Sequence, residues 1–141
     1  MAKSPLKIKI PLSQAESTAK KMARTIKGGE VIALIGPLGI GKTTFTKTLG
    51  KALGIKQSIP SPTFVMMQEF AIPKQKLYLY HLDLYRIKNY KEVSSLGITQ
   101  WWGHPETVTV IEWADKIQAH LPKDTIIIYL HRDVNEHNSK N

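Results

Sequence analysis

The chain has 141 residues, a length typical of one compact domain with a sheet and flanking helices. Its hydrophobic content of 42%, with scattered Gly and Pro, excludes a disordered or collagen-like chain. The absence of cysteine excludes disulfides and thiolate metal sites, and the net charge of +9 would attract phosphate-rich partners.

The terminal segments and the net charge of the chain give expectations for its cellular location and its binding partners. No apolar stretch approaches the roughly 18 to 20 residues of a membrane span, and no signal-like segment follows the first residues. We therefore expect a cytoplasmic protein with a single domain over residues 1–141 and a polar tail from about residue 135. The positive charge has two interpretations: direct contact with RNA, or a lysine-rich surface without such a partner.

The first third of the chain predicts an edge strand, a helix and a buried strand. Residues 7–10 alternate in polarity like a short edge strand. Ser13 followed by Glu16 fits a capping box and predicts the start of an amphipathic helix, which the glycines at 28–29 end. Residues 31–35 form an uninterrupted apolar run, which is typical of a central strand covered on both faces.

The middle of the chain predicts a second helix and a hairpin. Residues 42–53 have helical composition and end at Gly54, which suits a left-handed helix cap. The segment 63–84 contains two stretches rich in aromatic and aliphatic residues, separated by a proline-containing turn. This pattern predicts a β-hairpin.

The last third predicts two more buried strands, at residues 108–111 and 125–130, because both runs are apolar and of strand length. A helix is expected between them, around residues 115–120.

Residues 36–43 match the phosphate-binding pattern G-x-x-x-x-G-K-[ST], between a predicted strand and a predicted helix. Glycines let the backbone N–H groups of such a loop turn toward phosphates, and Lys42 adds a positive charge at the β- and γ-phosphates. Thr43 would place its hydroxyl on Mg²⁺, and Thr44 would lie near the α-phosphate. The sequence therefore predicts nucleotide binding, through Leu38, Gly39, Ile40, Gly41, Lys42, Thr43 and Thr44.

Two acids are candidates for the metal-holding carboxylate that P-loop proteins carry at the end of a buried strand. Asp83 and Glu112 each follow an apolar run, and the residues alone leave open which is the principal metal ligand. For each, the alternative is a strand-terminal acid that faces solvent. Thr63, in a Ser-Pro-Thr segment before a strand, either senses the γ-phosphate or belongs to an ordinary turn.

The five histidines lack the H-x-x-x-H and H-E-x-x-H spacings of zinc sites, so we expect them to be surface or packing residues. For the adjacent pair Trp101 and Trp102, core packing is the expectation, with a partner surface as the alternative.

Taken in order and spacing, several segments resemble the TsaE (YjeE) family, the bacterial ATPases needed for threonylcarbamoyl-adenosine (t6A) modification of tRNA. The resemblance runs from about residue 10 to residue 130. It is carried by the loop at 36–45, Ser61-Pro62-Thr63-Phe64, the His-Leu-Asp-Leu-Tyr-Arg segment at 81–86, Leu96-Gly97-Ile98 and Ile111-Glu112-Trp113.

The resemblance implies a three-layer α/β P-loop fold with a central, mostly parallel sheet. It also implies ATP and Mg²⁺ as ligands, with the metal held by Thr43 and Glu112. It places Asp83 and Thr63 near the γ-phosphate and Trp113 beside the metal site. Lys42, Asp83 and Thr63 are accordingly the expected catalytic residues.

The resemblance further implies a partnership with TsaB and TsaD, in which ATP binding and hydrolysis reset the complex between cycles. TsaD would transfer the threonylcarbamoyl group to adenosine 37, so this chain would not carry out the transfer itself. We expect a weak ATPase that its partners stimulate. Contact with tRNA would be indirect or through the basic surface.

The chain departs from the family pattern at Pro37, where the family usually has Asp or Glu, and in its basic charge. A small-molecule kinase of the P-loop class is the alternative function, although the sequence has no arginine cluster for a lid. A regulatory GTPase would need the N-K-x-D signature for guanine, which is absent.

Overall fold

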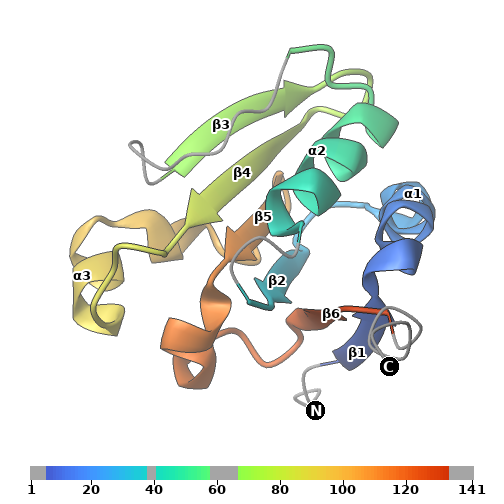
Figure 1. The fold of residues 1–141 in the computed structure, drawn as a ribbon. Helices are drawn as coiled ribbons and strands as arrows, with labels where there is room; N and C mark the ends of the chain where they lie inside the picture. Colours follow the sequence, from blue (N-terminus) through green and yellow to red (C-terminus); the bar gives the residue numbers. More distant parts are fainter. Residues whose placement is uncertain (1–5, 38–40, 58–66, 134–141) are drawn as a thin grey trace, which may run out of the picture.

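The computed structural model describes residues 6–37, 41–57 and 67–133. A six-stranded sheet in the order β1-β6-β2-β5-β4-β3 runs through the molecule (Figure 1). All neighbours pair in parallel except β3 and β4, which form an antiparallel hairpin. The strands are β1 (Leu6–Pro11), β2 (Val31–Ile35), β3 (Met67–Ile72), β4 (Leu77–Asp83), β5 (Thr107–Glu112) and β6 (Ile126–His131).

Helical segments cover both faces of this sheet. One face packs against α1 (Ala15–Thr25) and α2 (Lys42–Ala52), and the other against α3 (Tyr90–Ser95) and two 3-10 segments, η2 (Ile98–Trp101) and η3 (Ala114–His120). The expected three-layer α/β fold with a mostly parallel sheet is therefore confirmed. None of the helices in the described ranges is long and apolar enough to cross a membrane.

Strand β2 is apolar throughout because both of its faces are covered by helical layers. Ile32 and Leu34 pack with the α1–α2 layer, whereas Val31 and Ala33 pack with the layer of α3, η2 and η3. All four side chains are buried. A strand covered on both faces has no solvent side on which a polar residue would be favoured, and this prediction is confirmed.

The predicted capping box at the start of α1 is wrong. A short 3-10 turn, η1 (Leu12–Gln14), precedes the helix, which begins at Ala15. The backbone N–H of Ser13 donates to the Asp133 carboxylate at 3.1 Å, and Glu16 pairs with Lys20 at 3.0 Å. Because both members of the expected box have other partners, the reciprocal hydrogen bonds of a capping box do not form.

Helix α2 and the hairpin agree with their predictions, and Gly54 adopts the expected left-handed conformation with φ +93°. The helix expected around residues 115–120 is the 3-10 segment η3, which Ile117 interrupts with non-helical angles. Helix α3 and segment η2 were not predicted. Residues 63–66, which the hairpin prediction included, lie outside the described residues.

The carboxyl ends of β2, β4 and β5 meet at one edge of the sheet because these neighbouring strands run parallel. In the register of the sheet, Glu112 of β5 lies opposite Leu34 on one side and Asp83 on the other. The loop that follows β2 therefore starts next to the two acids. In open α/β sheets, ligands bind at this edge.

Candidate nucleotide-binding site

Gly41 joins the phosphate loop to α2 and serves as the N-cap of that helix. Its φ of +99° lies in the left-handed region that favours glycine, and a Cβ here would lie 3.1 Å from the Leu12 side chain. The first backbone N–H groups of a helix have no acceptor within it and form an anion-binding end. The start of α2 is such an end. Three predicted contacts, Leu38, Gly39 and Ile40, lie outside the described residues.

Lys42 lies at the start of α2 with its ammonium group turned to the loop. Its Nζ donates to the carbonyl oxygens of Gly36 at 2.6 Å and Pro37 at 3.0 Å, and lies 3.9 Å from the centre of the Trp113 ring. Burial lowers the pKa of Lys42, while the negative charges of Glu112, Asp115 and Asp83 act in the opposite direction. The buried Lys42 ammonium group is thus held against the first two residues of the loop.

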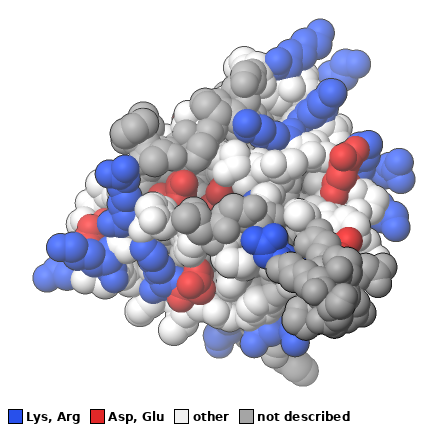
Figure 2. Space-filling model, viewed as in Figure 1, with Lys and Arg blue, Asp and Glu red and all other residues white. Residues whose placement is uncertain are grey.

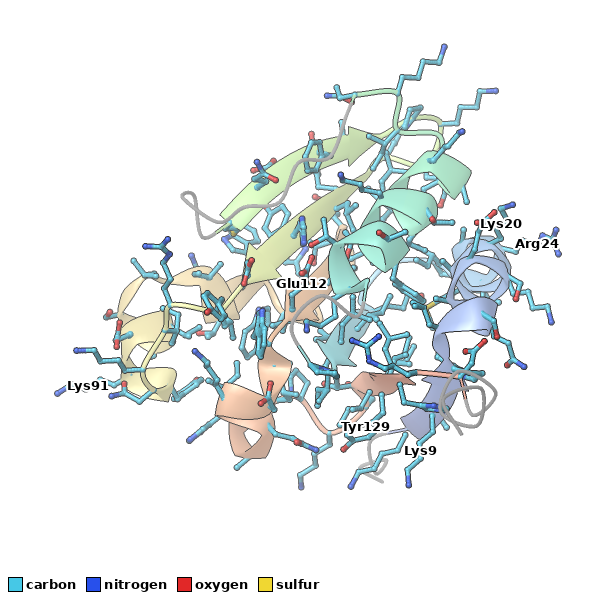
Figure 3. The ribbon with its side chains drawn as sticks, in the orientation of Figure 1. Lys9, Lys20, Arg24, Lys91, Glu112 and Tyr129 are labelled. Atoms are coloured by element: carbon cyan, nitrogen blue, oxygen red, sulfur yellow. The ribbon has the colours of Figure 1, made fainter. Side chains whose placement is uncertain are left out.

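Thr43 and Glu112 are joined across the gap between α2 and β5. The Thr43 hydroxyl donates to the two carboxylate oxygens of Glu112, at 3.0 Å and 3.2 Å. Glu112 is only 2% exposed and lies near the middle of the molecule, beside the start of α2 (Figure 3). The two residues predicted to hold a metal therefore lie in contact.

His81 is the site residue that the sequence analysis missed. Its Nε2 lies 2.5 Å from Oε2 of Glu112, and its side chain is fully buried. His81 is buried, as expected of a packing residue, but the sequence did not predict its contact with Glu112. The signal was the two-residue period of a strand, which places His81 on the same face of β4 as Asp83.

Asp83 ends β4 directly opposite Glu112. One of its carboxylate oxygens, Oδ1, accepts the backbone N–H of Tyr85 at 2.9 Å. Burial is the main cause that raises the pKa of Asp83, and the negative charge of Glu112 adds to it, while the hydrogen bond from Tyr85 opposes it. Asp83 is thus a partly desolvated carboxyl group beside Lys42 and Glu112.

Trp113 follows Glu112 in a left-handed conformation, with φ +61°. This region is unfavourable for a bulky residue and costs on the order of 1–3 kcal/mol. The indole ring contacts both the Lys42 ammonium and the Tyr85 ring, with 5.1 Å between the Trp113 and Tyr85 ring centres. The turn therefore places an aromatic face against the loop lysine.

The oxygens of Thr43 and Glu112 fit a magnesium ion. Within residues 6–37, 41–57 and 67–133, no group of three or more His, Asp and Glu side chains is arranged to hold a metal. Mg²⁺ does not need one, because it usually takes one or two protein oxygens, several waters and the phosphates of its substrate. A hydroxyl and a carboxylate in contact at the start of α2 supply such a pair. Thr63, the remaining predicted catalytic residue, lies outside the described residues.

The fold and the site together define the class of this protein. A buried parallel strand leads through a glycine loop into a helix that begins with Lys42 and Thr43, and neighbouring strands end at Asp83 and Glu112. This is a fold of the P-loop NTPase type.

Comparison with known proteins identifies the family within that class. The family model "Threonylcarbamoyl adenosine biosynthesis protein TsaE" matches residues 11–140. The chain is 38% identical over 119 residues to the tRNA threonylcarbamoyladenosine biosynthesis protein TsaE of Bacillus subtilis, covering 84% of this chain and 72% of that protein. The TsaE protein of Treponema pallidum is 36% identical over 119 residues, covering 82% and 85%.

A solved structure agrees with this assignment. The crystal structure of Bacillus subtilis YdiB superposes with a TM-score of 0.64 at 32% identity, covering 88% of this chain and 75% of that one. The chain belongs to the TsaE family, which takes part in the biosynthesis of threonylcarbamoyladenosine in tRNA.

Proposed function

We propose that this chain binds ATP with Mg²⁺ and hydrolyses it, as the ATPase subunit of the machinery that makes t6A at position 37 of tRNA. The observation that carries the proposal is the contact of Thr43 with Glu112, next to the buried ammonium of Lys42. Membership of the TsaE family supports the assignment to tRNA modification.

Lys42 and the start of α2 would bind the phosphates. The ammonium group now donates to two neutral carbonyls, and a phosphate oxygen would give it a charged acceptor in the same buried setting, which makes a stronger hydrogen bond. Thr43 and Glu112 would hold the metal ion, which supplies positive charge at the β- and γ-phosphates.

Asp83 would orient the attacking water and accept its proton. A carboxyl group whose pKa is raised by burial is a better base than an exposed one. Asp83 also lies across from Glu112 in the sheet, so it is close to the place where the γ-phosphate would lie. We propose Thr63 as a γ-phosphate sensor on the resemblance alone.

The proposed partners are TsaB and TsaD, with ATP turnover resetting their complex while the transfer to tRNA takes place on TsaD. Family membership supports this part of the proposal. The chain by itself should hydrolyse ATP slowly.

Measuring phosphate release with and without a stoichiometric TsaB–TsaD complex tests the proposal. We expect the complex to raise the turnover of the wild-type chain, and Lys42→Ala to remove most of the stimulated rate because it deletes the phosphate-binding charge. Turnover that stays the same in an assembled mixture, or that survives Lys42→Ala, would contradict the proposal.

A further inference from the structure

The positive charge of the chain is concentrated on one layer of the fold. Residues 15–57 and 73–77 contain ten Lys and Arg but two Asp and Glu, a net charge of +8. The rest of the chain contains ten basic and nine acidic residues, a net charge of +1. Nearly all of the excess of +9 therefore lies in residues 15–57 and in the turn between β3 and β4.

Apart from Lys42, which is buried, the basic residues of the two helices are exposed because the other faces of the helices pack into the core. Helix α1 packs its alanines at 15, 19 and 23 into the core, and α2 packs Phe45 and Leu49 into the same cluster. Their outer faces are exposed and basic. Figure 3 shows Lys20 and Arg24 on the outer side of α1.

The turn between β3 and β4 extends this surface. A Cβ placed on Gly54, just after α2, would lie 3.8 Å from the ring of Pro73, so the turn lies against the end of the helix. This contact brings the turn lysines to those at the end of α2. We call the combined surface the basic face; its exposed members are Lys20, Lys21, Arg24, Lys47, Lys51, Lys56, Lys74 and Lys76.

Few acids offset the basic face. In the part of the chain that the structure describes, its one ion pair joins Lys20 to Glu16. The carboxylate of Glu30 accepts the backbone N–H groups of Lys27 and Gly28. In Figure 2, blue side chains gather at the upper right without red ones, whereas blue and red lie together at the right and on the left.

The composition of the basic face favours a phosphate backbone over a protein partner. Protein interfaces are built around aromatic and apolar anchors and are depleted in lysine. Among the described residues, the large exposed hydrophobic side chains are Leu6, Tyr78, Tyr85, Leu96 and Trp101, and none of them lies on α1 or α2. Surfaces that bind nucleic-acid backbones are strongly positive and use Lys and Arg on phosphates.

We propose that the basic face binds the phosphate backbone of tRNA without reading its sequence; the choice of tRNA rests on the family's part in tRNA modification. The surface lies outside the nucleotide site, so the proposal does not depend on ATP hydrolysis.

Two variants with the same loss of four charges test the proposal. The face variant combines Lys21→Gln, Lys47→Gln, Lys51→Gln and Lys56→Gln; the matched control combines Lys9→Gln, Lys88→Gln, Lys91→Gln and Lys123→Gln. All eight lysines are exposed. The dissociation constant for an unmodified tRNA transcript is measured by fluorescence anisotropy from about 50 to 200 mM KCl, the range in which phosphate contacts change affinity steeply.

For the wild-type chain we expect binding that weakens steeply with salt. In the face variant the slope of log K against log salt should fall by about three to four, since each lysine on a phosphate contributes about one. Its dissociation constant at 100 mM KCl should rise at least about tenfold. The control should keep the wild-type slope to within about one unit, and ATP binding should be unchanged in both variants.

Three results would overturn the proposal. No RNA binding by the wild-type chain at low salt would remove its basis. Equal losses in the two variants would show that net charge alone attracts RNA. A face variant that binds RNA normally but no longer assembles with the protein partners would assign the surface to a protein interface.

Discussion

Glu112 is held from two sides by hydrogen-bonding groups. Thr43 donates to it from α2, and the Nε2 atom of His81 lies 2.5 Å from it on the neighbouring strand. A buried carboxylate loses the hydration of bulk water, and these hydrogen bonds offset part of that cost. They also fix the direction in which its oxygens point, which makes His81 a positioning residue for the proposed metal ligand.

Replacing His81 tests this positioning role. We expect His81→Leu to weaken Mg²⁺ binding by the ATP complex about tenfold or more, since partners of a ligating carboxylate typically contribute that much. His81→Gln should recover much of the affinity because its amide nitrogen reaches about as far as Nε2, while the shorter Asn should not. A magnesium titration at saturating ATP measures the effect. Normal affinity in His81→Leu, or equal behaviour of Gln and Asn, would rule the role out.

We expect the ionised carboxylate of Asp83 to lower the free energy of unfolding of the protein without bound nucleotide. Burial raises the pKa of Asp83 above the ordinary value of 3.8, so the folded state binds the proton more tightly than the unfolded state. Stability contributed by this group is therefore present below pH 3.8 and lost as the pH rises through its raised folded pKa. Asp83→Asn removes the charge and still accepts the Tyr85 N–H through its amide oxygen.

We expect Asp83→Asn to melt at a higher temperature than the wild-type chain at pH 7.5, with a smaller difference near pH 4, and to hydrolyse ATP more slowly. Thermal denaturation followed by circular dichroism at both pH values measures the first effect. A variant that melts lower at pH 7.5, or by the same margin at both pH values, would contradict the assignment of the pKa shift.

Among individual residues, Lys42, Thr43, Asp83 and Glu112 could be predicted as site residues from the sequence, because each belongs to a motif or ends an apolar run. It did not predict His81, since the contact with Glu112 depends on how β4 and β5 pair. The left-handed backbone conformation of Trp113 could not be predicted from the sequence either. Its positive φ occurs at the turn into η3, where its ring contacts Lys42 and Tyr85.

Among the connections between elements, the link from α1 to β2 is tightly constrained. Gly28 has φ +112°, and a Cβ there would lie 2.0 Å from the carbonyl oxygen of Pro105. Gly103 has a similar φ of +79°, but nothing lies within 4 Å of its Cβ position. Substituting each glycine in turn therefore separates the free-energy cost of a positive φ, which both positions share, from the cost of the steric clash, which only Gly28 has.

We expect Gly28→Ala to destabilise the fold by about 3 kcal/mol or more, because the Pro105 backbone has to move. Gly103→Ala should cost about 1–2 kcal/mol, for the left-handed conformation alone. Urea denaturation at equilibrium measures both. Equal losses in the two variants would show that the close approach at Gly28 is relieved without cost.

Strands were easier to predict than helix ends and short helices. The apolar runs of β2, β5 and β6 identify themselves because both of their faces are buried. The start of α1 was misplaced because Asp133, 120 residues further along the chain, takes the Ser13 N–H. Helix α3 has six residues and one fully buried side chain, Val93, so it has too little apolar periodicity to be detected.

At the scale of the whole molecule, the two proposed binding sites lie in different layers of the fold. The carboxyl edge of the parallel strands gathers the phosphate loop, Asp83 and Glu112. The outer surface of α1 and α2 carries the basic face. Helix α2 belongs to both, since it begins at the loop and ends beside the β3–β4 turn. At the edge of the sheet, Thr43 and Glu112 are expected to hold Mg²⁺ with ATP.

The most direct test is a calorimetric titration of the full chain with ATP, in Mg²⁺ and in EDTA, for the wild type and for Glu112→Gln. The glutamine keeps the shape of the side chain and an acceptor for the Thr43 hydroxyl, but it removes the charge. We expect Mg²⁺ to strengthen ATP binding to the wild-type chain at least about tenfold and to have little effect on Glu112→Gln. A wild-type chain that binds no ATP, or a variant with the full magnesium effect, would contradict the account.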